Sequence, residues 1–409
     1  MSQFNCVTHI VDIYFACFTT YMTNNIKQHK IRTAIHYAHS HAETKRHLLS
    51  KFAHEKELAH SITLETFQQK TGLADFYWET TFYQHPYHQR PFAQALSEAE
   101  GYIFFLHGWD GSHRIWEELP LQLAVKNKRL ICFNLDVNGF GASPFLDDPP
   151  NPEQCSPAGL ISAVDLWLRA IDLWPQPNRP SPNRPSPNRL SPNPTAKRPF
   201  YLFVGHSMSG AALFYKDLTG WQNERYGFYA LAPALFCNDV QRRAFFTTMG
   251  LVGVKLPPSL NAIKNSLAPH IIEILGNGAS PEVKSEHLRI YNQTPFGTVA
   301  QVIYAMGVSA DMPQHPDWSR FRVALGHKDK VVNVNSTLNL LDELGFNSDQ
   351  IKVMLGDHYF FSFGDDSPAS HRTNQQLLFD DILAFCGCLA EQDNGLQKEL
   401  YATEKNGYL

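Results

Sequence analysis

The sequence lacks a segment that could serve as a membrane span or a secretory signal. The most apolar stretch near the N-terminus, residues 6–22, contains His9 and Asp12 and falls short of 18 clean apolar residues. A charged residue at the centre of a membrane helix opposes insertion by about 2.5–3.5 kcal/mol, and no lysine or arginine precedes this stretch. The sequence therefore predicts no stable membrane insertion.

Cysteine is also scarce, and its pattern excludes a disulfide framework. The 409 residues include seven cysteines, an odd number scattered along the chain, and Cys386-Gly387-Cys388 is not a C-x-x-C motif. Cys132 and Cys237 lie in apolar runs typical of a protein core. Reduced thiols of this kind favour a cytoplasmic location.

An excess of basic charge is missing too, as are the usual cofactor motifs. With 35 basic and 39 acidic residues, the net charge is −4, which indicates no nucleic-acid partner. There is no G-x-x-x-x-G-K and no G-x-G-x-x-G after a strand, so no nucleotide cofactor is expected. Histidines gather before residue 90, but His36, His39 and His41 have no matching carboxylate or cysteine cluster, so no metal is expected.

What the sequence does have is an alternation of apolar strands with helical stretches. At 43% hydrophobic residues it can bury a large core, and alternating strands and helices predict a parallel sheet covered on both faces. Helices are expected at residues 115–124, 158–174 and 375–392. Strands are expected at residues 62–67, 76–82, 102–106, 130–135, 200–204, 226–231, 321–325 and 351–355.

The same pattern predicts how the chain divides. Residues 1–60 form a polar N-terminal extension, helical or disordered. The core follows in two parts, residues 61–235 and 320–392, separated by a helical cap at 236–319. Residues 175–198 contain the repeat Asn-Arg-Pro-Ser-Pro, an extended surface loop, and residues 393–409 form a polar tail.

The most informative motif is the run Gly205-His206-Ser207-Met208-Ser209-Gly210, which follows the apolar residues 199–204. It has the strand–turn–helix setting of a G-x-S-x-G nucleophile elbow, in which small residues allow a serine to project from a strained turn. Ser209 stands where the second glycine is usual. We expect Ser207 to be a nucleophile.

A serine hydroxyl needs a base and an acid that orients the base. In this arrangement the chain order is serine, acid, histidine, each just after a strand. His358 follows the last strand and is the candidate base, and Asp329 follows the strand before it. Asp239 is the alternative acid, because it follows the strand at 226–231.

Two backbone amides are candidates for the oxyanion hole. The strand at 102–106 ends in His107-Gly108-Trp109. The N–H of Trp109 could supply one donor and the N–H of Met208 the other, whereas His107 itself is expected to be structural.

Taken together, the His107-Gly108-Trp109 loop, the Asp136-to-Ser143 loop, the elbow, Asp329 and His358 resemble an α/β-hydrolase of the helical-cap type over roughly residues 62–390. The resemblance implies a mostly parallel eight-stranded sheet flanked by helices, a Ser-His-Asp triad and no cofactor. The family's dehalogenases and epoxide hydrolases use an aspartate nucleophile. With a serine at position 207, the resemblance therefore implies acyl chemistry.

The sequence therefore predicts a serine hydrolase that cleaves a carboxylic ester or related acyl bond of a small, apolar substrate. The same triad would serve a C–C bond hydrolase, a thioesterase or a lipase, and these alternatives stay open. A ligand-binding, receptor-like protein with little turnover is the alternative from another class. The sequence does not indicate an oligomeric state.

Overall fold

The computed structural model describes residues 40–175, 198–222, 224–255, 261–276, 278–309, 311–362 and 369–391. Of the sequence predictions, the proline-rich repeat, the polar tail and most of the N-terminal extension lie outside these residues. The strands of the described part form one sheet: β1 (Ala42–Leu48), β2 (Tyr77–Tyr83), β3 (Gly101–Leu106), β4 (Leu130–Leu135), β5 (Phe200–His206), β6 (Tyr226–Leu231), β7 (Phe321–Gly326) and β8 (Ile351–Met354).

The strand order is β1-β2-β4-β3-β5-β6-β7-β8. Only β2 runs antiparallel to its two neighbours, and the six strands from β4 to β8 are parallel. This confirms the predicted eight-stranded, mostly parallel sheet. The central strands β3, β4, β5 and β6 are buried along their whole length, as continuous apolar strands of parallel sheets usually are.

Helices cover both faces of the sheet. In the described residues they are α2 (Leu49–Glu55), α3 (Leu64–Thr71), α4 (Phe92–Ser97), α5 (Leu119–Lys126), α6 (Pro157–Ala170), α7 (Met208–Ala212), α8 (Val240–Lys255), α9 (Asn261–Leu275), α10 (Pro281–Gln293), α11 (Phe296–Val308), α12 (Val334–Glu343) and α13 (Ala369–Glu391). Alternate side chains of β3 enter two cores: Phe104 packs on the face that α6 and α12 cover, and Phe105 on the face that α5 and α13 cover.

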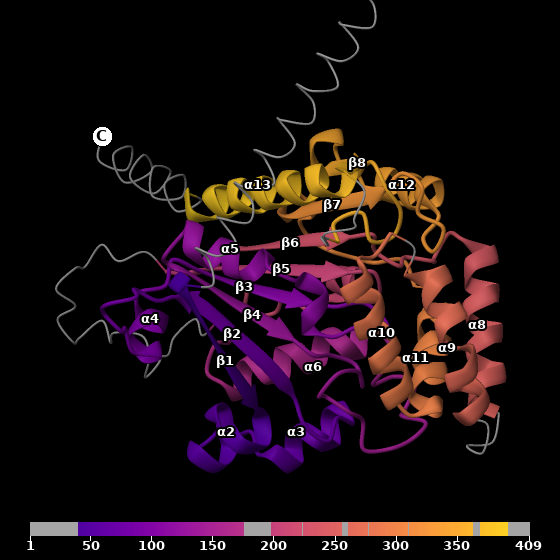
Figure 1. Cartoon of the computed structure of the whole chain (residues 1–409), viewed down its shortest axis with the longest axis horizontal. Helices are drawn as coiled ribbons and strands as arrows, with labels where there is room; N and C mark the ends of the chain where they lie inside the picture. Colours follow the sequence, from indigo (N-terminus) through magenta and orange to yellow (C-terminus); the bar gives the residue numbers. More distant parts are fainter. Residues whose placement is uncertain are drawn as a thin grey trace, which may run out of the picture.

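The helices α8 to α11, here called the helical insertion, lie in the chain between β6 and β7. Figure 1 shows them grouped beyond the carboxyl ends of the parallel strands, where the loops after β3 and β5 also lie. Ligands of open α/β sheets bind outside these strand ends, so the insertion stands where it can cover a site.

Two sequence predictions at the N-terminal side are wrong. Of the strand predicted at residues 62–67, residues 64–67 instead begin helix α3, because the Thr63 side chain caps the helix by accepting from the Thr66 N–H at 3.0 Å. Residues 42–55, expected in an extension outside the core, instead form β1 and α2. The charged edge strand β1 pairs with β2, and its polar composition, common in edge strands, hid it from the hydrophobic pattern.

Candidate active site

The predicted nucleophile lies in a strained turn between β5 and α7. Ser207 has φ 53° and ψ −113°, a backbone conformation that non-glycine residues rarely adopt. A Cβ atom on Gly205 would come within 2.7 Å of the Ser209 carbonyl oxygen, and one on Gly210 within 3.0 Å of the Gly205 carbonyl oxygen. The strand and the helix approach too closely for larger residues, as a nucleophile elbow requires.

Ser209, the departure from the usual motif, has a structural explanation. Its side chain is fully buried, and its hydroxyl donates a hydrogen bond to the His107 carbonyl at the end of β3. The extra hydroxyl therefore joins the elbow to the loop after β3 while remaining small enough for the turn.

The predicted base and acid are in contact. The Nδ1 atom of His358 lies 2.8 Å from Oδ2 of Asp329, and both side chains are buried. The other Asp329 oxygen accepts hydrogen bonds from the N–H groups of Val331 and Val332, at 2.8 and 2.9 Å. Because the carboxylate only accepts, Nδ1 of His358 donates, which leaves Nε2 as the proton acceptor.

Asp239, the alternative acid, has a different environment. Its Oδ1 atom accepts from the N–H of Arg242 at 3.0 Å, at the start of α8. Among the described residues, the carboxylate in contact with His358 is that of Asp329 and not that of Asp239. The geometry thus favours Asp329, the first choice from sequence.

The two predicted oxyanion donors flank Ser207. A Cβ atom on Gly108 would lie 3.0 Å from the Cβ of Ser207, so the loop that carries Trp109 passes directly beside the serine. Met208 is the first residue of α7, where a helix leaves its N–H without an intrahelical partner. In the part of the chain that the structure describes, neither N–H is used in another hydrogen bond.

Two neighbouring histidines are structural. His107 donates from Nδ1 to the Gly108 carbonyl at 2.7 Å and accepts at Nε2 from the Val137 N–H at 2.9 Å. His206 is fully buried, and its Nε2 donates to the His358 carbonyl at 3.2 Å. Burial lowers the pKa of both imidazoles, so both are neutral supports of the site.

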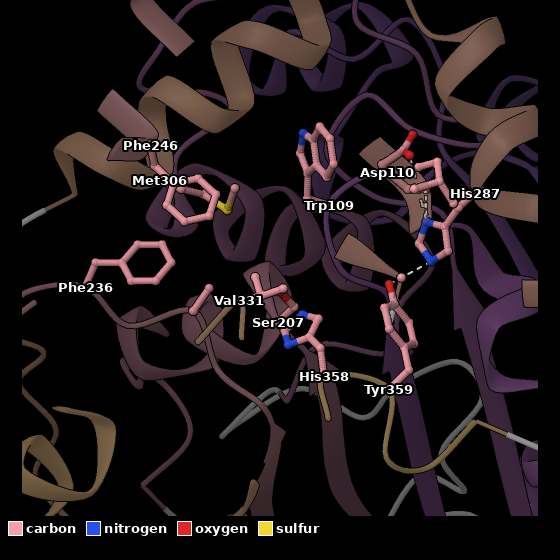
Figure 2. Close-up of a pocket in the computed structure, with 13 residues that line it drawn as sticks. Trp109, Asp110, Ser207, Phe236, Phe246, His287, Met306, Val331, His358 and Tyr359 are labelled. Carbon is pink, nitrogen blue, oxygen red and sulfur yellow. Dashed lines mark hydrogen bonds and ion pairs between the residues drawn. The ribbon is translucent and has the colours of Figure 1, made fainter. Parts of the chain in front are cut away.

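Ser207 and His358 line one cavity, where Figure 2 shows them side by side. The rest of its wall comes from the core loops and the helical insertion: Trp109, Asp110, Ala234, Phe236, Phe246, Ile272, Gly276, His287, Met306, Val331 and Tyr359. Sequence reasoning missed Asp110, His287 and Tyr359 as cavity residues. Asp110 and Tyr359 stand beside motif residues, whereas nothing in the local sequence of His287 marks it.

A separate ion-pair cluster joins the segments that follow β3 and β4 to strand β2. His113 lies between Asp136 and Glu79, with Nδ1–Oδ1 and Nε2–Oε1 distances of 2.8 and 3.4 Å. Burial opposes a charge on His113, but hydrogen bonds and the charges of both carboxylates outweigh it and raise its pKa to about 9. The pKa of Glu79 falls to about 2, because hydrogen bonds from His113, Tyr77 and Arg46 outweigh its burial.

The described residues also bear on the broader sequence predictions. Their five cysteines are all unpaired. No helix among them is both long and apolar enough to cross a bilayer. They bring together no group of three or more histidine, cysteine or acidic side chains suited to a metal ion.

The described chain has the α/β-hydrolase fold that the sequence resembles. Similar solved structures include an esterase from Thermogutta terrifontis (12% identity, 78% of this chain and 95% of that one, TM-score 0.49) and epoxide hydrolase I from potato (14%, 84% and 99%, 0.49). A hydrolase from Pseudomonas aeruginosa is also similar (14%, 76% and 95%, 0.47). No protein-family model and no curated protein matches the sequence.

Proposed function

We propose that this protein is a serine hydrolase that cleaves a carboxylic ester or related acyl bond through Ser207, His358 and Asp329. The observation that carries the proposal is the 2.8 Å contact between His358 and Asp329, in a cavity that also contains a serine on a strained elbow. A histidine oriented in this way by a carboxylate is what a serine hydroxyl needs to become nucleophilic.

The first half of the reaction forms an acyl-enzyme. Nε2 of His358 takes the Ser207 proton as Oγ attacks the carbonyl carbon, and Asp329 stabilises the imidazolium. The N–H groups of Trp109 and Met208 donate to the oxyanion; loss of one such donor costs roughly 10²–10³-fold in rate. The intermediate collapses, and His358 gives its proton to the departing alcohol.

The second half releases the acid. His358 takes a proton from water, the resulting hydroxide attacks the acyl carbon, and the C–Oγ bond breaks as the proton returns to Ser207. An acyl bond suits this cycle, because an acyl-serine is an ester that the same triad can hydrolyse. A serine that opened an epoxide would form an ether, which offers no carbonyl for the second attack.

The cavity and its surroundings support a small-molecule substrate. Apolar side chains of the helical insertion, Phe246, Ile272 and Met306, contribute to the cavity wall, so we propose that the insertion acts as a cap over the bound acyl compound. Thioesterases, C–C bond hydrolases and lipases would use the same triad and differ in the substrate that they bind. We also propose a cytoplasmic setting, since the described cysteines are unpaired.

The experiment that tests the proposal is the Ser207→Ala substitution, assayed with short p-nitrophenyl esters. We expect kcat to fall by roughly 10⁶-fold, as in other triads that lose their serine. A fluorophosphonate should label the wild-type protein at Ser207 and leave the variant unlabelled. Equal turnover by the two proteins would refute the proposal. Labelling without turnover of any ester would favour the receptor-like alternative.

A further inference from the structure

The cavity around Ser207 has two chemically different sides. Figure 2 shows Phe236, Phe246 and Met306 on one side, and Asp110, His287 and Tyr359 on the other, with Ser207 and His358 between them. An acyl compound extends in two directions from its reacting carbonyl. With the carbonyl at Ser207, one half of the substrate faces apolar side chains and the other half faces polar ones.

Hydrogen bonds on the polar side fix the position of each proton. Nδ1 of His287 lies 2.5 Å from the Asp110 carbonyl oxygen, and Nε2 lies 2.6 Å from the Tyr359 hydroxyl. A carbonyl oxygen only accepts, so Nδ1 carries the proton. Burial lowers the pKa of His287 to about 4, with the Asp110 carbonyl opposing the shift. In the neutral ring Nε2 accepts, and the Tyr359 hydroxyl therefore donates to His287.

Once its proton is given to His287, the Tyr359 oxygen can only accept. Both Tyr359 and His287 are almost fully buried. Tyr359 directly follows His358 in the sequence. A hydrogen-bond donor in the cavity would stabilise the buried hydroxyl oxygen, because a buried polar atom without a partner costs free energy.

The Asp110 carboxyl is a second sign that this side is incomplete without a ligand. It is fully buried, and neither oxygen has a hydrogen-bond partner among the described residues. Its Oδ2 atom lies 3.9 Å from Nδ1 of His287, but the Nδ1 proton is already donated to the Asp110 carbonyl oxygen. Burial raises the pKa of this carboxyl well above its ordinary value.

We propose that Tyr359, positioned by His287, accepts a hydrogen bond from a hydroxyl or N–H group of the substrate. The substrate class is then an acyl compound with an apolar half, bound by Phe236, Phe246 and Met306, and a half that carries a hydrogen-bond donor close to the scissile carbonyl. This inference rests on the proposed hydrolase function and specifies its substrate.

Isosteric ester pairs test the inference directly. In the alcohol half, 2-hydroxyethyl butanoate is compared with propyl butanoate. In the acyl half, ethyl 3-hydroxypropanoate is compared with ethyl butanoate. Each kcat/KM ratio is divided by the same ratio for hydroxide-catalysed hydrolysis, which removes differences in intrinsic reactivity. In one of the two halves we expect a preference for the hydroxyl compound of about 2- to 10-fold, the size of one net hydrogen bond.

Two substitutions separate the roles of the two side chains. Tyr359→Phe should reduce the preference to a ratio near one. In His287→Leu the Tyr359 hydroxyl would no longer donate to His287 and could donate to the substrate instead. The kcat/KM ratio for 2-methoxyethyl butanoate over butyl butanoate, which reports a preference for a hydrogen-bond acceptor, should therefore rise. The preference for the hydroxyl compound should fall. Tyr291→Phe is the matched control, a buried tyrosine that packs against Trp109 but does not line the cavity, and should keep the wild-type ratios.

The outcomes also distinguish this inference from the proposed function. Fluorophosphonate labelling of Ser207 shows that each variant is folded, and if His287→Leu fails to label, the wild-type and Tyr359→Phe ratios decide. Ratios near one in both halves of the wild type, with Ser207-dependent turnover, would overturn the subsite alone. A hydroxyl preference that persists in Tyr359→Phe would also overturn it. Ester turnover that survives Ser207→Ala would overturn both proposals.

Discussion

At the scale of single residues, the pair His358–Asp329 carries the proposed chemistry. Replacement of Asp329 by asparagine keeps the size of the side chain but removes the charge, and an amide that donates to Nδ1 would hold the wrong tautomer. We expect Asp329→Asn to lower kcat by about 10⁴-fold, measured in the ester assay on protein that keeps its wild-type unfolding transition.

Asp239→Asn is the matched control for this substitution. Asparagine can still accept from the Arg242 N–H at the start of α8, so kcat should stay close to the wild-type value. A large loss in Asp239→Asn together with near-normal Asp329→Asn would assign the acid to Asp239.

Ser209 gives a second prediction at this scale. Ser209→Ala keeps a small side chain but leaves the His107 carbonyl without the hydroxyl that now donates to it. The free energy of unfolding, measured by urea denaturation, should fall by about 1 kcal/mol, and Ser207 should still be labelled by a fluorophosphonate. An unchanged unfolding free energy would mean that the hydroxyl does not join the elbow to β3.

At the scale of secondary-structure elements, the His113 cluster makes stability depend on pH. The pKa of His113 is raised to about 9, so its contribution is complete below about pH 6.5, the ordinary histidine pKa, and is lost as the pH rises through 9. The pKa of Glu79 is lowered to about 2, so its contribution is complete above its ordinary pKa and is lost as the pH falls toward 2.

His113→Gln tests this pH dependence. Wild-type unfolding free energy should decline between pH 6.5 and 9, and the variant should lose most of that slope. Urea denaturation at several pH values measures both curves. Parallel curves for the two proteins would show that His113 is not charged in the fold.

A buried ion pair connects α6 to the segment after α7. Lys216 contacts the carboxylate of Asp165, and its ammonium group lies 4.6 Å from the ring centroid of Trp221. Lys216→Met alone should cost roughly 3–5 kcal/mol, because it leaves a buried charge unpaired. The double variant Lys216→Met/Asp165→Leu should recover most of that loss in urea denaturation; strictly additive losses would contradict the pairing.

At the scale of the whole molecule, the helical insertion and the sheet form one site. Helices α8 and α11 pack closely, since a Cβ atom on Gly250 would lie 2.3 Å from the Tyr304 nitrogen. Gly250→Leu should force these helices apart and displace Phe246 and Met306 from the cavity wall. We expect KM for butanoate esters to rise, with fluorophosphonate labelling retained. An unchanged KM would argue against a cap role for the insertion.

The strands and candidate site residues that could be predicted from sequence are those marked by a pattern of neighbouring residues. The strands at 130–135 and 226–231 were predicted to the residue, because each is a buried apolar run with clear ends. The elbow, Asp329 and His358 could be proposed from sequence because each lies within a few residues of the end of such a strand. The edge strand β1 has the composition of a surface segment, and α3 begins at a threonine cap within an alternating pattern.

The polar side of the cavity could not be predicted for a different reason. His287 and Asp110 are 177 positions apart, and their contact depends on where the insertion rests on the sheet. A pattern in the local sequence carries no information about such a contact. The identity of the reaction could thus be argued from motifs, whereas the substrate's polar group required the assembled molecule.

The central claim is that Ser207 forms an acyl-enzyme, and trapping that species tests it most directly. A reaction with p-nitrophenyl butanoate is quenched in acid within the first turnover, and the protein is digested and analysed by mass spectrometry. We predict one butanoyl group on the peptide that contains Ser207, absent from Ser207→Ala. Turnover with no acyl adduct, or with the adduct on another residue, would contradict the account.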